Sequence, residues 1–73
     1  MEIQLDTAYH NPRKGEWYRL VRAPVPIRRW PDPPPGYEVQ GSFSVDGPWQ
    51  RRHNRPDRVQ AEDVLQRMLA QSP

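Results

Sequence analysis

The stretch 37–45, YEVQGSFSV, decides the fold, because apolar and polar side chains alternate along it. Successive side chains of a strand point to opposite faces, so this period of two predicts a strand with one buried face. Asp46-Gly47 follows as a hairpin turn dipeptide. Pro48 cannot donate to a central ladder, so we expect residues 49–52 to return as a short edge strand.

The N-terminal part of the chain repeats this hairpin pattern. Residues 3–9 alternate in the same way and predict a half-buried strand. Residues 10–15 contain Pro12 and Gly15, which are typical of a turn, and residues 16–22 resume strand character. We therefore expect a second hairpin with a basic tip.

The side chains on these strands divide into a core set and an outward set. The apolar faces predict burial of Tyr18, Leu20, Tyr37, Val39 and Phe43. The opposite face of the strand 16–22 would carry Trp17, Arg19 and Val21.

Prolines separate the two predicted hairpins. Two prolines in residues 23–26 argue against a central strand and indicate a bend, after which residues 27–30 could form a short edge strand. Residues 31–36, PDPPPG, predict an extended connector that turns at its glycine. A stiff connector is the simpler interpretation of its three consecutive prolines, although a proline-recognition domain binds such runs too.

The C-terminal part changes to a helical period. Its apolar residues recur at helical spacing and predict a helix over about residues 58–71, with one stripe formed by Ala61, Val64, Leu65, Met68 and Leu69. Asp57 with Gln60 three residues later fits a capping box at its start. The sequence thus predicts an α+β fold in one domain, 1–73: a small antiparallel sheet of three to five strands with one C-terminal helix packed on it.

Composition limits the class of protein. A chain of 73 residues with 34% hydrophobic residues has a thin core, and without cysteine it forms neither disulfides nor a cysteine-based metal site. No apolar run reaches the roughly 20 residues of a membrane span, and the polar N-terminus does not resemble a signal peptide. We expect a cytoplasmic protein that does not contact membranes and is a monomer when free.

The chain lacks the residue sets that catalysis and metal binding need. His10 and His53 are far apart and have no ligand-like spacing around them. The serines lack a nucleophile motif, there is no glycine-rich phosphate loop, and Glu62-Asp63 is more simply a charge effect at the helix start. We therefore expect no enzyme activity, no metal and no cofactor.

Each of the three tryptophans has an arginine within two positions. Tryptophan, tyrosine and arginine are the residues most enriched at binding hot spots, so these clusters indicate a binding protein. The candidate partner-binding residues are Arg13, Lys14, Trp17, Arg19, Val21, Arg28, Arg29, Trp30, Trp49, Arg51 and Arg52. Among them, the face with Trp17 and Arg19, extended by the basic loop at Arg13-Lys14, is the first choice.

Structural alternatives remain for these clusters. Trp30 and Trp49 flank prolines and could act as packing lids. The basic charge lies in two blocks, net +5 over residues 10–30 and net +3 over 51–58, and a solvated face explains them as well as a binding patch does. A GC-rich genome would equally explain ten arginines against one lysine.

Over its whole length the chain resembles the small transcription regulators encoded by lytic phages of Xanthomonas. The resemblance rests on the segments EWYRLVR at 16–22 and IRRW at 27–30, together with the chain's size, its lack of cysteine and its richness in arginine and proline. It implies a protein that binds host bacterial RNA polymerase, inhibits host promoter initiation and promotes read-through of terminators. It does not assign the polymerase subunit or the interface residues.

Two other functions stay open. A single-stranded nucleic-acid-binding module would use strand aromatics to stack bases and arginines to neutralise phosphates, and the same groups could make a secondary contact with nucleic acid beside a protein partner. A net charge of +2 is low for a dedicated nucleic-acid binder. An accessory or structural subunit would instead keep all three tryptophans in internal packing.

Overall fold

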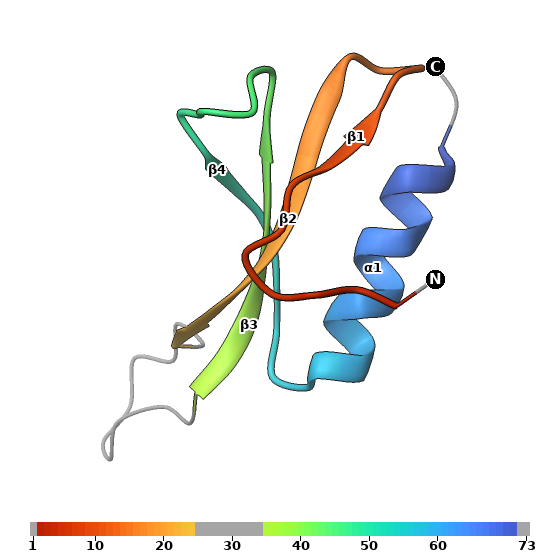
Figure 1. The fold of residues 1–73 in the computed structure, drawn as a ribbon. Helices are drawn as coiled ribbons and strands as arrows, with labels where there is room; N and C mark the ends of the chain where they lie inside the picture. Colours follow the sequence, from red (N-terminus) through yellow and green to blue (C-terminus); the bar gives the residue numbers. More distant parts are fainter. Residues whose placement is uncertain (1, 25–34, 72–73) are drawn as a thin grey trace.

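The computed structural model describes residues 2–24 and 35–71, which fold as a four-stranded antiparallel sheet with one C-terminal helix (Figure 1). This α+β architecture confirms the predicted fold class. The elements in chain order are β1 (Tyr9–Asn11), β2 (Glu16–Pro24), β3 (Pro35–Ser42), β4 (Gln50–Arg55) and α1 (Arg58–Ala70).

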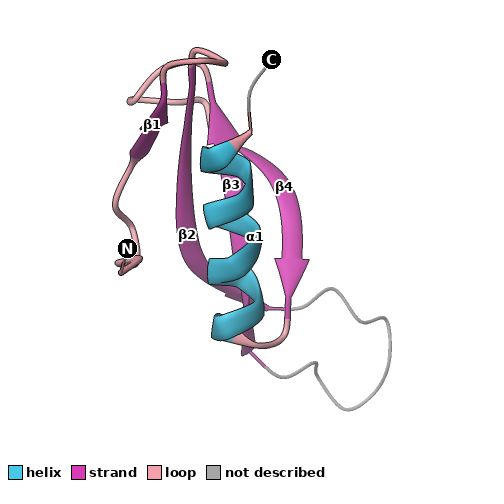
Figure 2. Cartoon of the chain, turned by 90° about the vertical axis from the view of Figure 1, so that its right-hand side faces the viewer, coloured by secondary structure: helices cyan, strands magenta, loops and turns pink. Residues whose placement is uncertain are grey.

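The strands lie in the sheet in the order β1-β2-β3-β4, and each neighbouring pair is antiparallel. The helix α1 lies across one side of the sheet, in front of β2, β3 and β4 in the view of Figure 2. No other element of the described residues covers the opposite side (Figure 1). The sheet therefore has a helix side and an open side.

The core lies between the helix and the sheet. From the sheet, Tyr18, Leu20 and Val39 are fully buried, and the helix contributes the buried side chains of Ala61, Leu65 and Met68 with Val64 and Leu69 packed at their margin. The five helix residues of this core are those of the predicted apolar stripe, so the helical period correctly identified the side of α1 that faces the core. Tyr37 is partly buried against the same cluster.

Side chains fix both ends of α1. At its start, Asp57 Oδ1 accepts a hydrogen bond from the Val59 backbone N at 3.1 Å, which confirms the predicted capping residue. At its end, the buried Asn11 side chain donates to the carbonyl oxygens of Met68 and Gln71 at 3.0 and 3.2 Å. The end of the helix, where Met68 O also accepts from the Gln71 backbone N at 3.4 Å, is thereby tied to the β1–β2 hairpin.

The predicted strand over residues 3–9 is wrong, because the strand starts only at Tyr9. Asp6 adopts a left-handed conformation with φ of 62°, which breaks the extended chain, and its backbone N donates to Leu20 O at 2.8 Å. Ile3 is nevertheless fully buried, and its carbonyl accepts from Arg58 on the helix. The alternation thus identified Ile3 as buried, with Leu5 and Tyr9 partly buried, in a segment that forms a strand only from Tyr9, whereas Thr7 is exposed.

The predicted strand over residues 37–45 is shifted towards the N-terminus. β3 begins at Pro35 and ends at Ser42, where the Ser42 hydroxyl accepts a hydrogen bond from the Ser44 backbone N at 3.1 Å and the chain turns. Phe43 lies beyond this turn with 76% of its surface exposed, so its predicted burial is wrong. Val45 is exposed as well.

The turn expected at Asp46-Gly47 is present, but it is part of a longer connection. Gly47 N donates to Ser44 O at 3.0 Å, and Gly47 has a φ of 90°, which suits glycine. β4 is an edge strand, as Pro48 predicted, and it extends three residues further than the predicted strand, to Arg55.

The proline segment also differs from the prediction at both of its ends. β2 continues through Ala23 and Pro24, which pair with Gly36 and Pro35. A proline is tolerated there because β1 reaches only Tyr18, so no described strand lies beside Pro24 on that edge. The connector predicted over 31–36 therefore loses its last two residues to β3, whereas the possible strand at 27–30 lies outside the described residues.

Candidate functional site

The open side of the sheet carries a row of aromatic and polar side chains that come from all four strands and the loop before β4. Alternation along the strands and the contacts described below place them opposite the helix. We call this surface the open face and define it by His10, Trp17, Arg19, Val21, Glu38, Gln40, Trp49 and Arg51.

The first part of the open face is a stacked pair of rings at the β1–β2 hairpin. His10 and Trp17 are register partners, and their ring centroids lie 4.5 Å apart with 28° between the planes. His10 is exposed and Trp17 is half-buried. The stack orders the indole against the imidazole while leaving part of the pair accessible to a partner.

A second aromatic contact joins β2 to the loop before β4. The guanidinium of Arg19 lies 4.4 Å from the centroid of the Trp49 ring, within the range of a cation–π interaction. The Nε of Arg19 also donates to Gln40 Oε1 at 2.6 Å. Both Arg19 and Trp49 are half-buried, so the pair is held in place and still borders solvent.

A chain of polar contacts continues from this pair across the sheet. Gln40 Nε2 donates to the carboxylate of Glu38, whose other oxygen lies 3.8 Å from Arg51 Nε. The Glu38 side chain is 15% exposed and that of Arg51 is 55% exposed. One shielded carboxylate therefore lies between two arginines, and the outer arginine is the accessible one.

This arrangement is suited to recognition. Large planar groups are already ordered by contacts within the protein, so a partner would bury them at a low cost in side-chain entropy. Indole and guanidinium groups on rigid strands are also the most frequent anchors of protein interfaces. The predicted residues Trp17, Arg19, Val21, Trp49 and Arg51 are brought together here.

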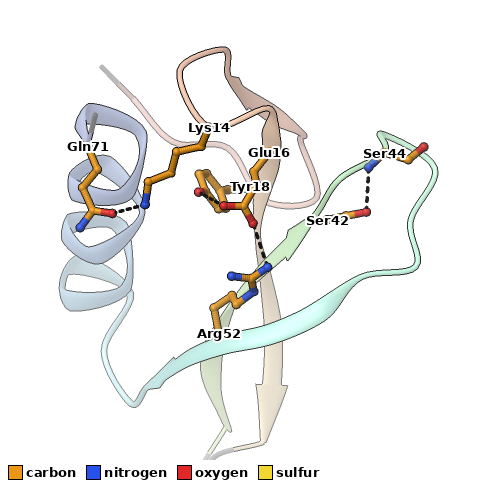
Figure 3. Close-up of polar contacts among 7 residues, drawn as sticks. All are labelled: Lys14, Glu16, Tyr18, Ser42, Ser44, Arg52 and Gln71. Atoms are coloured by element: carbon orange, nitrogen blue, oxygen red, sulfur yellow. Dashed lines mark hydrogen bonds and ion pairs between the residues drawn. The ribbon is translucent and has the colours of Figure 1, made fainter. Parts of the chain in front are cut away.

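Arg52 lies elsewhere, although it adjoins Arg51 in sequence. Its Nη2 donates to Glu16 Oε2 at 2.8 Å, and Glu16 Oε1 accepts from the hydroxyl of the core residue Tyr18 at 3.0 Å (Figure 3). Arg52 therefore belongs to a polar cluster on the helix side, where it partners a nearly buried carboxylate.

The environment of Tyr18 has an electrostatic consequence. Burial, reinforced by the hydrogen bond to Glu16 and the charge of that carboxylate, raises the pKa of Tyr18 to about 12, and the charge of Arg52 offsets only part of this. The phenol stays neutral and serves as a structural donor.

The basic loop does not extend the open face as expected. Lys14 Nζ donates to Gln71 Oε1 at 2.7 Å, which directs this side chain to the end of the helix (Figure 3). Arg13 is exposed in the turn between β1 and β2. The remaining candidates, Arg28, Arg29 and Trp30, lie outside the described residues.

Three members of the open face were missed by sequence reasoning: His10, Glu38 and Gln40. Glu38 and Gln40 could have been found, since they alternate with Tyr37 and Val39 and so had to face away from the core. His10 reaches the face only through its register with Trp17, which the sequence does not reveal.

A shallow hollow of about 190 Å³ lies beside the loop after β3. It is smaller than the roughly 300 Å³ at which small-molecule sites begin. Its lining residues are Gly41, Ser42, Phe43, Ser44, Gly47, Pro48, Gln50 and Arg52. Within residues 2–24 and 35–71, no three histidine, acidic or cysteine side chains gather where they could hold a metal ion.

No helix in the described part of the chain combines the length and the apolar character that crossing a membrane requires. No family model, curated protein or solved structure matches this chain.

Proposed function

We propose that this protein is a phage regulator of transcription that acts in the host cytoplasm and uses the open face to bind bacterial RNA polymerase. In this role it inhibits initiation at host promoters and promotes read-through at terminators. The proposal that polymerase is the partner rests on the resemblance of residues 16–22 and 27–30 to phage regulators.

The observation that supports a binding role is the ordered aromatic and guanidinium pairing on an uncovered sheet. The His10 ring stacks on Trp17, and the Arg19 guanidinium stacks on Trp49. Three of these residues are in strands, and Trp49 directly precedes β4. Internal packing alone would place such rings on the helix side, where the core lies. Binding at this face would regulate a large enzyme by blocking a moving part or a sigma-factor contact.

The direct test is capture of polymerase. The tagged protein is incubated with nuclease-treated bacterial lysate, and the bound proteins are identified. We expect polymerase subunits to be retained by the wild type and to be lost from Trp17→Ala, because truncating an interface anchor costs about 2 kcal/mol or more. The control is Val59→Ser, which changes an exposed apolar residue on α1.

A transcription assay then separates the two regulatory effects. Purified polymerase is supplied with a template that carries one promoter and one intrinsic terminator, and the protein is added before or after initiation. We expect fewer transcripts in the first case and longer transcripts in the second. Failure of the wild type to retain polymerase, or retention that Trp17→Ala leaves unchanged, contradicts the proposal.

Single-stranded nucleic acid is the alternative partner, since the stack of exposed His10 on half-buried Trp17 also resembles a platform for bases. Glu38 weighs against it, because a carboxylate between Arg19 and Arg51 repels phosphates. Titration with an oligonucleotide at increasing salt decides between them. Tight binding that weakens steeply with salt would favour nucleic acid.

A further inference from the structure

The described charges are divided unequally between the two sides of the protein. The open face has two arginines, Arg19 and Arg51, against the single carboxylate of Glu38. On the helix side the charges are matched within the protein, in the ion pairs Arg52–Glu16, Arg58–Glu62 and Arg67–Asp63. An approaching acidic group therefore meets an excess of positive charge on the open face, whereas the ion pairs on the helix side are balanced.

The arginines of the molecule also differ in how fully they are engaged. Arg52 binds Glu16 at 2.8 Å and Arg58 binds Glu62 at 2.8 Å, both at full hydrogen-bonding distance. Arg51 is only 3.8 Å from Glu38, and 55% of its side chain is exposed. A guanidinium has five N–H donors, so Arg51 keeps donors for a second carboxylate.

Glu38 divides its two carboxylate oxygens between Gln40 and Arg51. Its carboxylate already accepts from Gln40, which in turn accepts from Arg19. These contacts hold Glu38, whose side chain is largely shielded, while more than half of the Arg51 side chain is exposed. A carboxylate from outside would meet an oriented guanidinium that forks onto carboxylates in a bidentate manner.

The surroundings of Arg51 define the rest of the ligand. Trp49 and Trp17 supply apolar surface on the same face, and both are half-buried by their partners Arg19 and His10. A ligand that only carried charge would leave these rings uncovered. A polypeptide with alternating acidic and apolar side chains would contact both.

We propose that the open face takes an extended acidic segment of a protein partner, with one carboxylate bound by Arg51 and a neighbouring apolar side chain packed on the tryptophans. The inference rests on the proposed function, under which this segment belongs to RNA polymerase. It goes beyond that function in specifying an acidic and apolar segment as the contact and Arg51 as the residue that binds its carboxylate.

The test compares charge reversal on the two sides of the protein. Arg51→Glu places a carboxylate beside Glu38 on the open face, and Arg67→Glu places one beside Asp63 on the helix, where the native pair is also exposed. Affinity for purified core polymerase is measured at about 50 and 200 mM salt. Thermal unfolding of each variant verifies that the fold is kept.

We expect Arg51→Glu to weaken polymerase binding at least about tenfold at low salt, mainly through slower association, and Arg67→Glu to change it less than about twofold. Arg51→Lys should restore part of the loss, since lysine keeps the charge but loses the planar fork. If the wild type binds polymerase and the two charge reversals change its affinity equally, the proposed acidic segment is wrong, while the proposed function stands.

A second arm tests the acidic segment without polymerase. A synthetic peptide of about ten residues that alternates glutamate with leucine is titrated into the labelled protein and followed by NMR, with an oligonucleotide of equal charge in parallel. The expected shifts lie at Arg51, Trp17 and Trp49 with the peptide and are absent with Arg51→Glu. Shifts on the helix, no shifts, or a stronger response to the oligonucleotide overturn the inference.

Discussion

Arg52 of β4 reaches across β3 to donate to Glu16 of β2 at 2.8 Å, so an ion pair joins two strands that are not neighbours in the sheet. The side chain passes over Gly41, where an added Cβ would lie 3.1 Å from Arg52 Nε and 3.3 Å from two of its carbons. The glycine is needed here for space, since its φ is not positive. The pair therefore depends on a missing side chain on the strand between.

Gly41→Ala should destabilise the protein by about 1 kcal/mol, because Arg52 is held by Glu16 and cannot move aside without loosening that pair. Urea unfolding measures the effect. In an Arg52→Ala background the same substitution should cost less, and this difference is the coupling between the two positions. Equal costs in both backgrounds would show that the two residues are independent.

The stability of the protein should fall in alkaline solution because of Tyr18. Its pKa is raised from 10.0 to about 12 in the fold, so the stabilisation is complete below pH 10 and is lost as pH rises towards 12. The loss amounts to at most about 3 kcal/mol. Tyr18→Phe should reduce the slope of stability between pH 10 and 12, whereas Tyr37→Phe should keep it.

The stability of the protein should depend on both the hydrogen-bond donor and the charge of the side chain at position 11. Asn11→Ala removes the side-chain donor from the carbonyls of Met68 and Gln71, of which Met68 O keeps the Gln71 backbone N–H, and should cost about 1–2 kcal/mol. Asn11→Asp should cost more, since it also brings a negative charge to the negative end of the helix. Helix content and urea unfolding give the values, with the exposed Thr7→Ala as the control. A smaller cost for aspartate than for alanine would contradict this account.

Phe43 and Leu20 should differ sharply although both are large and apolar. Phe43→Ser should change stability by less than about 0.5 kcal/mol, because the ring is 76% exposed. Leu20→Ala should cost about 2–4 kcal/mol, since Leu20 is fully buried between the sheet and the helix. Thermal unfolding compares them, and a large cost at Phe43 would mean that the loop after β3 packs more closely than described.

The parts of the fold that sequence reasoning located are those with a local period. The helix stripe around Leu65 and the alternation of Tyr18 with Trp17 depend only on neighbours a few positions apart. Phe43 fitted the same alternation but lies after a turn that a serine hydroxyl creates, and no period signals such a hydrogen bond. Asp6 was missed for a similar reason, since a left-handed residue interrupts an otherwise regular pattern.

The site was predictable as a list of residues but not as an arrangement. The density of arginine grouped Arg51 with Arg52, and the fold places them on opposite sides of the sheet. The contact of Arg19 with Trp49 depends on the length of the β3–β4 connection and on the register of three strands, which are properties of the whole sheet.

The outer edge of the sheet bears on how the protein behaves at high concentration. β4 is an edge strand of sequence QRRHNR, has no acidic residue, and contains a register irregularity opposite Val39 and Gln40. Two copies that approached edge to edge would bring arginines against arginines and meet a strand that is not evenly spaced. This edge therefore disfavours the pairing of β4 with a second copy of the sheet.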